Sequence, residues 1–174
     1  MLFILSACQP LTFTQTEPKT ASQAKWKSVH EQHPFEMRDL VKVTRVIDGD
    51  TIEVERDGQK IKVRLIGVNT PETNHPQKGQ QPFGQEAKSY TTKQLEGKTV
   101  QLRIDLDSYD RYQRLLAYVY LVDGTMVNEV LIREGYAQVM SVPPNDTFAK
   151  RFVSLQREAR EQKRGLWAIG EQDE

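Results

Sequence analysis

The sequence predicts a mainly β domain of the α+β class, with five strands and about three helices. Five short runs alternate apolar and polar or β-branched residues, which is the pattern of half-buried strands. Three further runs place apolar residues at helical spacing. A chain of 174 residues that is 37% apolar suffices for one core, so a second is not expected.

The first three strands follow one another directly. Their apolar residues are Val41, Val43 and Ile47, then Ile52 and Val54, then Ile61, Val63 and Leu65. Asp57-Gly58 separates the second run from the third and is a strong hairpin signal. The three runs therefore predict a meander.

The second half of the domain mixes helices with two more strands. Residues 85–96 have helical spacing and stop before Gly97, a suitable residue just beyond a helix end. The strands follow at Val100, Leu102 and Ile104 and then at 116–122. Residues 127–134, closed by Gly135, and residues 147–164, with Phe148, Phe152, Leu155 and Ala159 on one face, predict two more helices. This order is compatible with a small closed barrel, with the OB-fold as the leading candidate, although periodicity leaves other α+β arrangements open.

The domain is expected to cover residues 38–170. Residues 9–37 are polar, lack periodicity and predict a flexible tether, and residues 171–174 form a short acidic tail. Basic and acidic residues number 24 each, so any nucleic-acid contact is expected from a local cluster rather than from bulk charge.

The N-terminus carries the single cysteine, which excludes an internal disulfide framework. Residues 1–8 end in Leu5-Ser6-Ala7-Cys8 after an apolar run and resemble a truncated bacterial lipoprotein signal. The resemblance implies lipidation at Cys8 and an extracytoplasmic protein anchored to the cell membrane by lipid. The alternatives are a secreted protein, or a frayed N-terminus with an incidental cysteine. No segment reaches the roughly 18 apolar residues of a spanning helix.

Three short blocks contain the side chains suited to chemistry. They are Asp48-Gly49-Asp50-Thr51, Arg64 with Asn69-Thr70-Pro71-Glu72-Thr73, and Asp110-Arg111-Tyr112-Gln113-Arg114. Gly49 is expected to let the chain turn tightly, although this turn alone is equally compatible with an ordinary surface loop. Arg64 lies on a strand, from which it either reaches solvent or points into a polar site.

Together the blocks predict a phosphodiesterase. Asp50 offers the carboxylate ligand that a hard cation such as Ca²⁺ prefers. Glu72 follows Pro71, which stiffens the loop that presents a candidate general base. Arg64 and Arg114 offer bidentate donors to the charged oxygens of a phosphorane-like transition state.

Ordered blocks across residues 42–167 resemble the thermonuclease family, typified by staphylococcal nuclease. The matching residues are Asp48-Gly49-Asp50-Thr51, Arg64-Leu65, Thr70-Pro71-Glu72-Thr73, His75-Pro76, Lys78-Gly79, Gly84, Glu86-Ala87, Arg114, Leu116-Ala117-Tyr118, Val127-Asn128-Glu129 and Trp167. The resemblance implies an OB-fold and a Ca²⁺-dependent endonuclease that acts on DNA and RNA and leaves 3′-phosphate products.

The same resemblance assigns roles to individual residues. Asp50, Asn69 and the Thr70 carbonyl take the positions of metal ligands, and Glu72 takes that of the group that activates water. Phosphate-binding roles fall to Arg64 and Arg114, substrate contacts fall to Tyr112 and Arg111, and the protein is expected to be monomeric.

Three departures from the family pattern concern the site. Asn69 replaces a carboxylate, which predicts weaker Ca²⁺ binding. Gln113 replaces a glycine, and Ser141-Val142-Pro143-Pro144 replaces a segment with two base-packing tyrosines, so base recognition is expected to differ. The alternative function is a catalytically weakened OB-fold module that binds nucleic acid without cutting it.

Overall fold

The computed structural model describes residues 40–73, 79 and 81–171, and for 169–171 the backbone alone. All of them belong to one compact unit, Phe35–Glu174. The predicted signal remnant, the tether before residue 40 and the end of the acidic tail lie outside the described residues. Cys8, the predicted lipidation site, also lies outside them.

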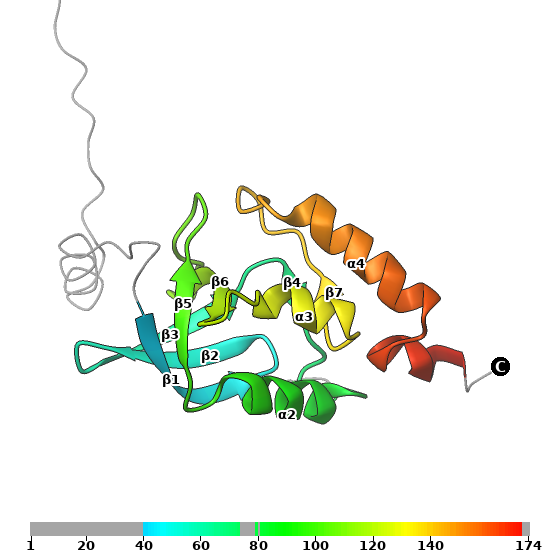
Figure 1. Ribbon diagram of the computed structural model, residues 1–174, viewed down its shortest axis with the longest axis horizontal. Helices are drawn as coiled ribbons and strands as arrows, with labels where there is room; N and C mark the ends of the chain where they lie inside the picture. The colour runs from blue at the N-terminus through cyan, green and yellow to red at the C-terminus, as the bar shows by residue number, and fades with distance from the viewer. Residues whose placement is uncertain (1–39, 74–78, 80, 172–174) are drawn as a thin grey trace, which may run out of the picture. The chain divides into compact units, whose positions relative to one another are not determined.

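Five strands close into a barrel in the order β1-β2-β3-β6-β5 (Figure 1). Their bounds are β1 Leu40–Asp48, β2 Thr51–Arg56, β3 Gln59–Leu65, β5 Thr99–Arg103 and β6 Leu115–Leu121. All neighbours pair antiparallel except β3 and β6, which pair in parallel with Arg64 opposite Leu116. The predicted fold class, a five-stranded OB-fold-like barrel with helices, is confirmed.

The turn chemistry read from the sequence is also confirmed. Asp57 and Gly58 have φ values of 51° and 73°, the paired positive values that a tight hairpin of this kind needs. Gly97 and Gly135, with φ values of 75° and 74°, lie just beyond the ends of two helices. At Gly135 space is limiting as well, because a Cβ would stand 2.1 Å from the Arg164 carbonyl oxygen.

Strand β1 departs from simple alternation. Its pairing with β2 shifts register between Val43 and Arg45 and again between Val46 and Asp48. Each irregularity breaks the two-residue repeat, so Val46 is buried in the core and Ile47 instead lines a cleft. The irregular end of β1 thus turns the following acidic residues toward that cleft.

Three α-helices and one 3-10 helix accompany the barrel in the described residues. They are α2 Gly84–Leu95, α3 Val127–Arg133, α4 Ala149–Glu161 and the 3-10 helix η1 Gly165–Glu171. Helix α2 packs against β1, and α3 packs between β6 and α4. Phe152 and Ala159 of α4 are buried, while Phe148 and Leu155 pack against the core from its edge, so the predicted apolar face is confirmed.

A second, two-stranded sheet was not predicted. Strand β4, Val68–Asn69, pairs antiparallel with β7, Gln138–Val139. The Met140 amide extends this pairing by donating to the Gly67 carbonyl at 3.0 Å. This small sheet places Asn69 beside the segment that follows α3.

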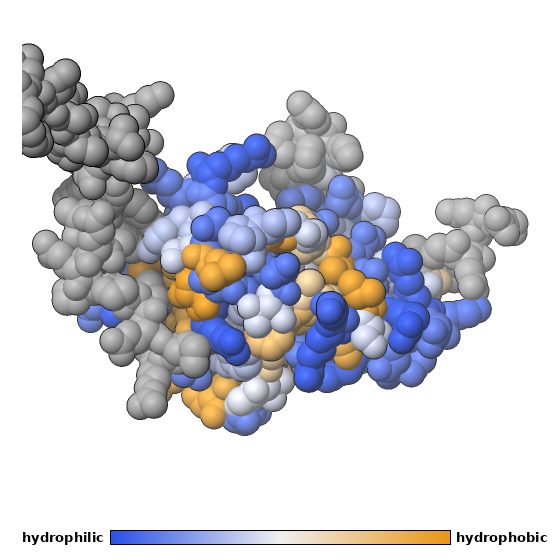
Figure 2. Space-filling model, turned by 90° about the horizontal axis from the view of Figure 1, so that it is seen from above, coloured by the Kyte–Doolittle hydropathy of each residue, from blue (hydrophilic) through white to orange (hydrophobic). Residues whose placement is uncertain are grey.

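The surface shows no single dominant apolar area on the face in Figure 2, where hydrophobic residues emerge in patches separated by hydrophilic ones. The large exposed apolar side chains are scattered through the fold at Leu40, Leu106, Tyr112, Val122 and Val153. Within the part of the chain that the structure describes, no helix has the length and hydrophobicity needed to span a bilayer.

Candidate active site

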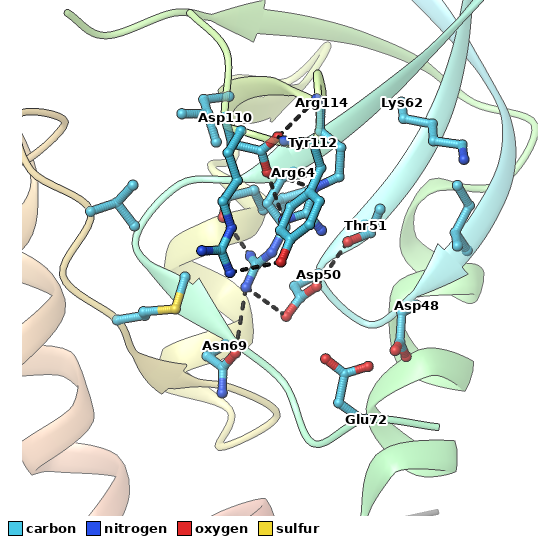
Figure 3. A pocket seen from close by; sticks show the side chains of 16 residues that line it. Asp48, Asp50, Thr51, Lys62, Arg64, Asn69, Glu72, Asp110, Tyr112 and Arg114 are labelled. Carbon is cyan, nitrogen blue, oxygen red and sulfur yellow. Dashed lines mark hydrogen bonds and ion pairs between the residues drawn. The ribbon is translucent and has the colours of Figure 1, made fainter. Parts of the chain in front are cut away.

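A cleft of about 710 Å³ opens beside the parallel pairing of β3 with β6. The three predicted blocks meet there with residues from β1, β3 and the β7 side, as Figure 3 shows. Its lining comprises Ile47, Asp48, Asp50, Thr51, Lys62, Arg64, Leu65, Asn69, Glu72, Asp110, Arg111, Tyr112, Arg114, Leu116, Met140 and Val142. Of the site residues expected in the described part of the chain, Thr70 alone is not in this lining.

The turn between β1 and β2 is held closely against its neighbours. A Cβ on Gly49 would stand 2.7 Å from Thr70 Oγ1, and Gly49 has no positive φ. Gly49 lies in the turn as expected, and the close approach of Thr70, rather than a positive φ, is what requires a glycine there. The Gly49 carbonyl accepts a hydrogen bond from Thr91 Oγ1 of α2 at 2.7 Å.

Asp50 is the most highly connected carboxylate of the turn. Its Oδ2 accepts the Thr70 amide at 2.9 Å and faces Arg64 Nη2 at 3.1 Å. Its Oδ1 accepts the Thr51 hydroxyl at 3.0 Å. Because the side chains of Asp50 and Arg64 are each 8% exposed, these contacts compensate for the cost of burying two charges.

Arg64 points into the polar site, which resolves the two alternatives for this residue. Its Nη1 donates to the Leu65 carbonyl at 2.8 Å and to the Val68 carbonyl at 2.7 Å. Burial lowers the pKa of Arg64, and the Asp50 carboxylate opposes that effect. The carbonyl contacts fix the plane of the guanidinium toward the cleft.

The candidate metal ligands are close to one another but carry little charge. Asn69 Oδ1 lies 3.5 Å from Arg64 Nη2, at the limit of a hydrogen bond. Thr70 is buried, and its Oγ1 has no hydrogen-bond partner among the described residues. Within residues 40–73, 79 and 81–171, no three His, Cys, Asp or Glu side chains come together as a metal site.

Glu72 lies on the loop after β4, whose backbone is fixed by Gln81. The Glu72 amide donates to Gln81 Oε1 at 2.8 Å, and the Gln81 amide donates to the Glu72 carbonyl at 3.0 Å. Although the residue is exposed overall, its carboxylate faces Asp48 across the cleft in Figure 3. Loss of hydration raises the pKa of Glu72, and the negative charges of Asp48 and Asp50 raise it further.

Arg114 is held by Asp110 from the same loop. Asp110 Oδ2 accepts from Arg114 Nε and from Arg114 Nη2, both at 2.7 Å. Asp110 Oδ1 accepts the amides of Tyr112 and Arg114, each at 2.9 Å. One carboxylate therefore shapes the loop and aims the guanidinium.

Two arginines of this loop lie close to the exposed aromatic ring of Tyr112. Arg111 Nη2 donates to the Tyr112 hydroxyl at 2.7 Å, and the Cζ atoms of Arg111 and Arg114 lie 4.7 Å and 5.5 Å from the Tyr112 ring centre. Gln113 has a φ of 61°, so it adopts the left-handed conformation expected of the glycine it replaces. The substitution therefore retains the turn.

Several cleft residues received no role from the sequence. Asp110 stood in a predicted block, and its spacing of four residues from Arg114 was the available signal for their contact. Met140 and Val142 form an apolar wall where the predicted segment 141–144 lacks tyrosines. Lys62 gave no signal of a functional role in the sequence, because it stands at a polar position of a β-strand and an exposed lysine is common there.

Known proteins resemble this chain over the same region. A family model described as "Staphylococcal nuclease homologue" matches residues 62–169. A thermonuclease of Staphylococcus intermedius is 45% identical over 125 residues, which cover 72% of this chain and 74% of that protein. The thermonuclease of Staphylococcus hyicus is 43% identical over 127 residues, covering 73% of this chain and 75% of that protein.

A relative from another genus matches a longer stretch. Endonuclease YncB of Bacillus subtilis (strain 168) is 39% identical over 160 residues, which cover 90% of this chain and 71% of that protein. The family model spans more than half of the chain and includes Arg64, Glu72 and Arg114. The chain belongs to the staphylococcal nuclease family of hydrolases.

Proposed function

We propose that the protein is a Ca²⁺-dependent endonuclease that hydrolyses DNA and RNA and leaves 3′-phosphate ends. The observation that carries this proposal is the convergence of Arg64, Glu72 and Arg114 on one cleft from three separate segments. A module that only binds nucleic acid has no chemical need for a general base in the same cleft as two arginines.

The donors available at the site fit Ca²⁺ better than a softer metal. Asp50 and Asn69 of the cleft and the carbonyl of the adjoining Thr70 offer oxygen ligands, and Glu72 adds a carboxylate to the same cleft. Thr70 Oγ1, buried against Gly49 of the β1–β2 turn, has no hydrogen-bond partner among the described residues. When bound, Ca²⁺ would supply positive charge to polarise the phosphodiester.

The two arginines retain donors for a phosphate. Both Nη1 hydrogens of Arg64 are donated to backbone carbonyls. The phosphate contact of Arg64 therefore comes from Nε, or from the Nη2 hydrogen whose hydrogen bond to Asn69 is long. Arg114 keeps its Nη1 group for substrate while Asp110 holds the other edge. Arg64 and Arg114 can thereby donate to different phosphate oxygens, which suits the charge spread over a pentacoordinate transition state.

Glu72 acts as the base in this proposal. Its carboxylate accepts a proton from water as the water oxygen attacks phosphorus in line with the departing 5′ oxygen. The P–O5′ bond breaks, the 5′ oxygen takes up a proton from solvent, and the phosphate remains on the 3′ side. The raised pKa of Glu72 makes it a stronger base than an ordinary glutamate.

Hydrolysis of single-stranded DNA by the full chain tests the proposal. Cleavage is expected with Ca²⁺, and it should cease with chelator and in Glu72→Gln. Glu86→Gln, which neutralises an exposed glutamate of α2, is the matched control and should retain activity. Mass spectrometry of the fragments should find the phosphate at their 3′ ends. Binding without metal-dependent cleavage would instead support the non-catalytic module.

We also propose that the protein is a monomer anchored outside the cytoplasm by lipid at Cys8, with secretion as the alternative. The support is the Leu5-Ser6-Ala7-Cys8 sequence alone. Mass spectrometry of the membrane fraction should find a diacylglyceryl adduct that is absent from Cys8→Ser. An unmodified, soluble wild-type protein would contradict the anchor, and light scattering would test the monomer.

A further inference from the structure

A group of exposed cations lies on the barrel wall next to the cleft. Arg45 of β1, with Lys60 and Lys62 of β3, surrounds Glu53 of β2, and we name these three cations the outer basic patch. Arg45 and Lys60 have side chains that are 61% and 66% exposed, whereas that of Glu53 is 11% exposed. The Glu53 carboxylate is thus mostly buried, whereas the cationic side chains of Arg45 and Lys60 are exposed to solvent.

Both oxygens of the Glu53 carboxylate already have partners. Its Oε1 accepts the Thr44 hydroxyl at 3.0 Å and lies 3.3 Å from Lys60 Nζ, and its Oε2 lies 3.6 Å from Arg45 Nη2. The Thr44 hydrogen bond lowers the pKa of Glu53 against the effect of burial, and Lys60 lowers it further. Glu53 therefore stays charged, and it forms ion pairs with Arg45 and Lys60 at the same time.

Lys62 is left without such a partner. It pairs directly opposite Glu53 in the sheet, yet no ion pair joins it to any residue within the described ranges. Its side chain lines the cleft instead, as Figure 3 shows. Because an unpaired lysine at the edge of a phosphate-binding cleft gains from an anion, Lys62 links the cleft to the patch.

The spacing along β3 extends this link. Lys60, Lys62 and Arg64 are two residues apart, so their side chains leave the same face of the strand at intervals of about 6.5 Å. Three cations in a row suit a flexible polyanion better than a compact anion. The exposed Glu55, opposite Lys60, offsets one charge and leaves the area net positive.

We propose that the outer basic patch binds the phosphodiester backbone of a single-stranded substrate where it leaves the cleft, with Lys62 as the first contact. The inference rests on the proposed nuclease function and extends it to substrates longer than the cleft itself. The chain has no net charge, so a local track of this kind supplies attraction that bulk charge does not. Continuity with the cleft favours nucleic acid over an anionic membrane surface as the occupant.

The test compares two variants with the same change in charge. Arg45→Gln/Lys60→Gln/Lys62→Gln removes the patch, and Lys93→Gln/Lys98→Gln/Lys150→Gln neutralises three exposed lysines that do not line the cleft. Lys62→Gln alone leaves the pairs of Glu53 intact, and it is the variant to use if the triple variant is unstable. Binding of an oligothymidylate of about 12 nucleotides, within the reach of one OB-fold, is measured by anisotropy in the Glu72→Gln background.

The expected result is a change in salt dependence. Each phosphate contact on a single strand contributes about 0.7 to the slope of log affinity against log salt, so the triple variant should lose about 2 in slope and Lys62→Gln about 0.7. At low salt the triple variant should bind roughly tenfold more weakly than the control variant. The kcat/KM for a dinucleotide, which occupies only the cleft, should be unchanged in Arg45→Gln/Lys60→Gln, because neither residue lines the cleft.

Two results would overturn the proposal. One is equal salt slopes for the patch and control variants. The other is unchanged oligothymidylate binding with loss of binding to phosphatidylserine vesicles, which would assign the patch to a membrane surface. Either outcome leaves the nuclease proposal intact if wild type cleaves the dinucleotide with Ca²⁺, whereas absence of that cleavage counts against the nuclease and not against the patch.

Discussion

Asp110 binds Arg114 through two nitrogen atoms, with Nε and Nη2 each 2.7 Å from the same carboxylate oxygen. This pair lies within one loop, and the other carboxylate oxygen of Asp110 caps two backbone amides of that loop. The orientation of Arg114, the second arginine proposed to bind phosphate, is therefore built into five residues of the sequence.

Asp110→Asn should reduce kcat/KM roughly tenfold, because the amide NH2 group that replaces Oδ2 cannot accept hydrogen bonds from Arg114 Nε and Nη2, and the guanidinium loses its charged acceptor. The asparagine oxygen still caps the loop, so the melting temperature should change little. Steady-state kinetics would measure the first effect and calorimetry the second. Asp107→Asn, at an exposed position of the same connection, is the control, and an equal loss in both variants would refute the positioning role of Asp110.

Asp48→Asn should move the acidic limb of the pH–rate profile to lower pH. In the proposed mechanism activity requires ionised Glu72, and the negative charge of Asp48 contributes to raising the pKa of that carboxyl. Removing the charge lowers the pKa of Glu72, so the base remains ionised in more acidic solution. An unmoved limb in kcat/KM profiles would show that the two carboxylates are not coupled.

Glu72→Gln should be more stable than wild type at neutral pH while being inactive. A carboxyl whose folded pKa is raised contributes stability that is present below its unfolded pKa and is lost as pH rises through the folded pKa. Glutamine stays neutral, so the two proteins should converge in acid and separate as pH increases. Urea unfolding with chelator present would measure this, and a constant difference across pH would contradict it.

Arg64→Ala should cost about 3–5 kcal/mol of unfolding free energy, since it leaves the buried Asp50 charge without its partner. Asp50→Ala/Arg64→Ala should cost less than the sum of the two single changes. A double-mutant cycle by urea unfolding gives both quantities. Additive losses would mean that the contact at 3.1 Å contributes nothing to the fold.

Gln113→Gly should raise the unfolding free energy by about 0.5–1 kcal/mol. The left-handed conformation of Gln113 costs roughly 1–2 kcal/mol, and part of that gain is offset by the greater entropy of glycine in the unfolded chain. Gln113→Ala should show no such gain because alanine keeps the strain. Equal stability of the two variants would contradict this account.

Asn69→Asp should tighten Ca²⁺ binding by restoring a charged ligand, with the affinity measured by calorimetry on the protein without substrate. The change also places a second carboxylate near Arg64 Nη2. Unchanged affinity would show that position 69 does not contribute a metal ligand in this chain.

The sequence predicted those features that repeat or that depend on local chemistry. Alternation located the five barrel strands, and Asp57-Gly58 specified its hairpin because both residues tolerate positive φ. Strands of two residues such as Val68–Asn69 carry no periodic signal, so the small second sheet was missed. The burial of Val46 in place of Ile47 depends on bulges in β1, which a two-residue repeat does not reveal.

The same distinction holds for the site. Residue types and order identified Asp50, Arg64, Glu72 and Arg114, and the structure brings all four to one cleft. What Lys62 contacts depends on whether Arg45 and Lys60 already occupy Glu53, and such competition is decided by three-dimensional packing.

The site is complete only after β3 has paired in parallel with β6. Arg64 lies on one side of this seam and Arg114 immediately precedes the other side, so the two guanidiniums meet only after strands distant in the chain have joined. A partly unfolded chain holds the two guanidiniums apart and therefore lacks the paired arginines of the cleft. Closure of the barrel is in this sense the activation step of the enzyme.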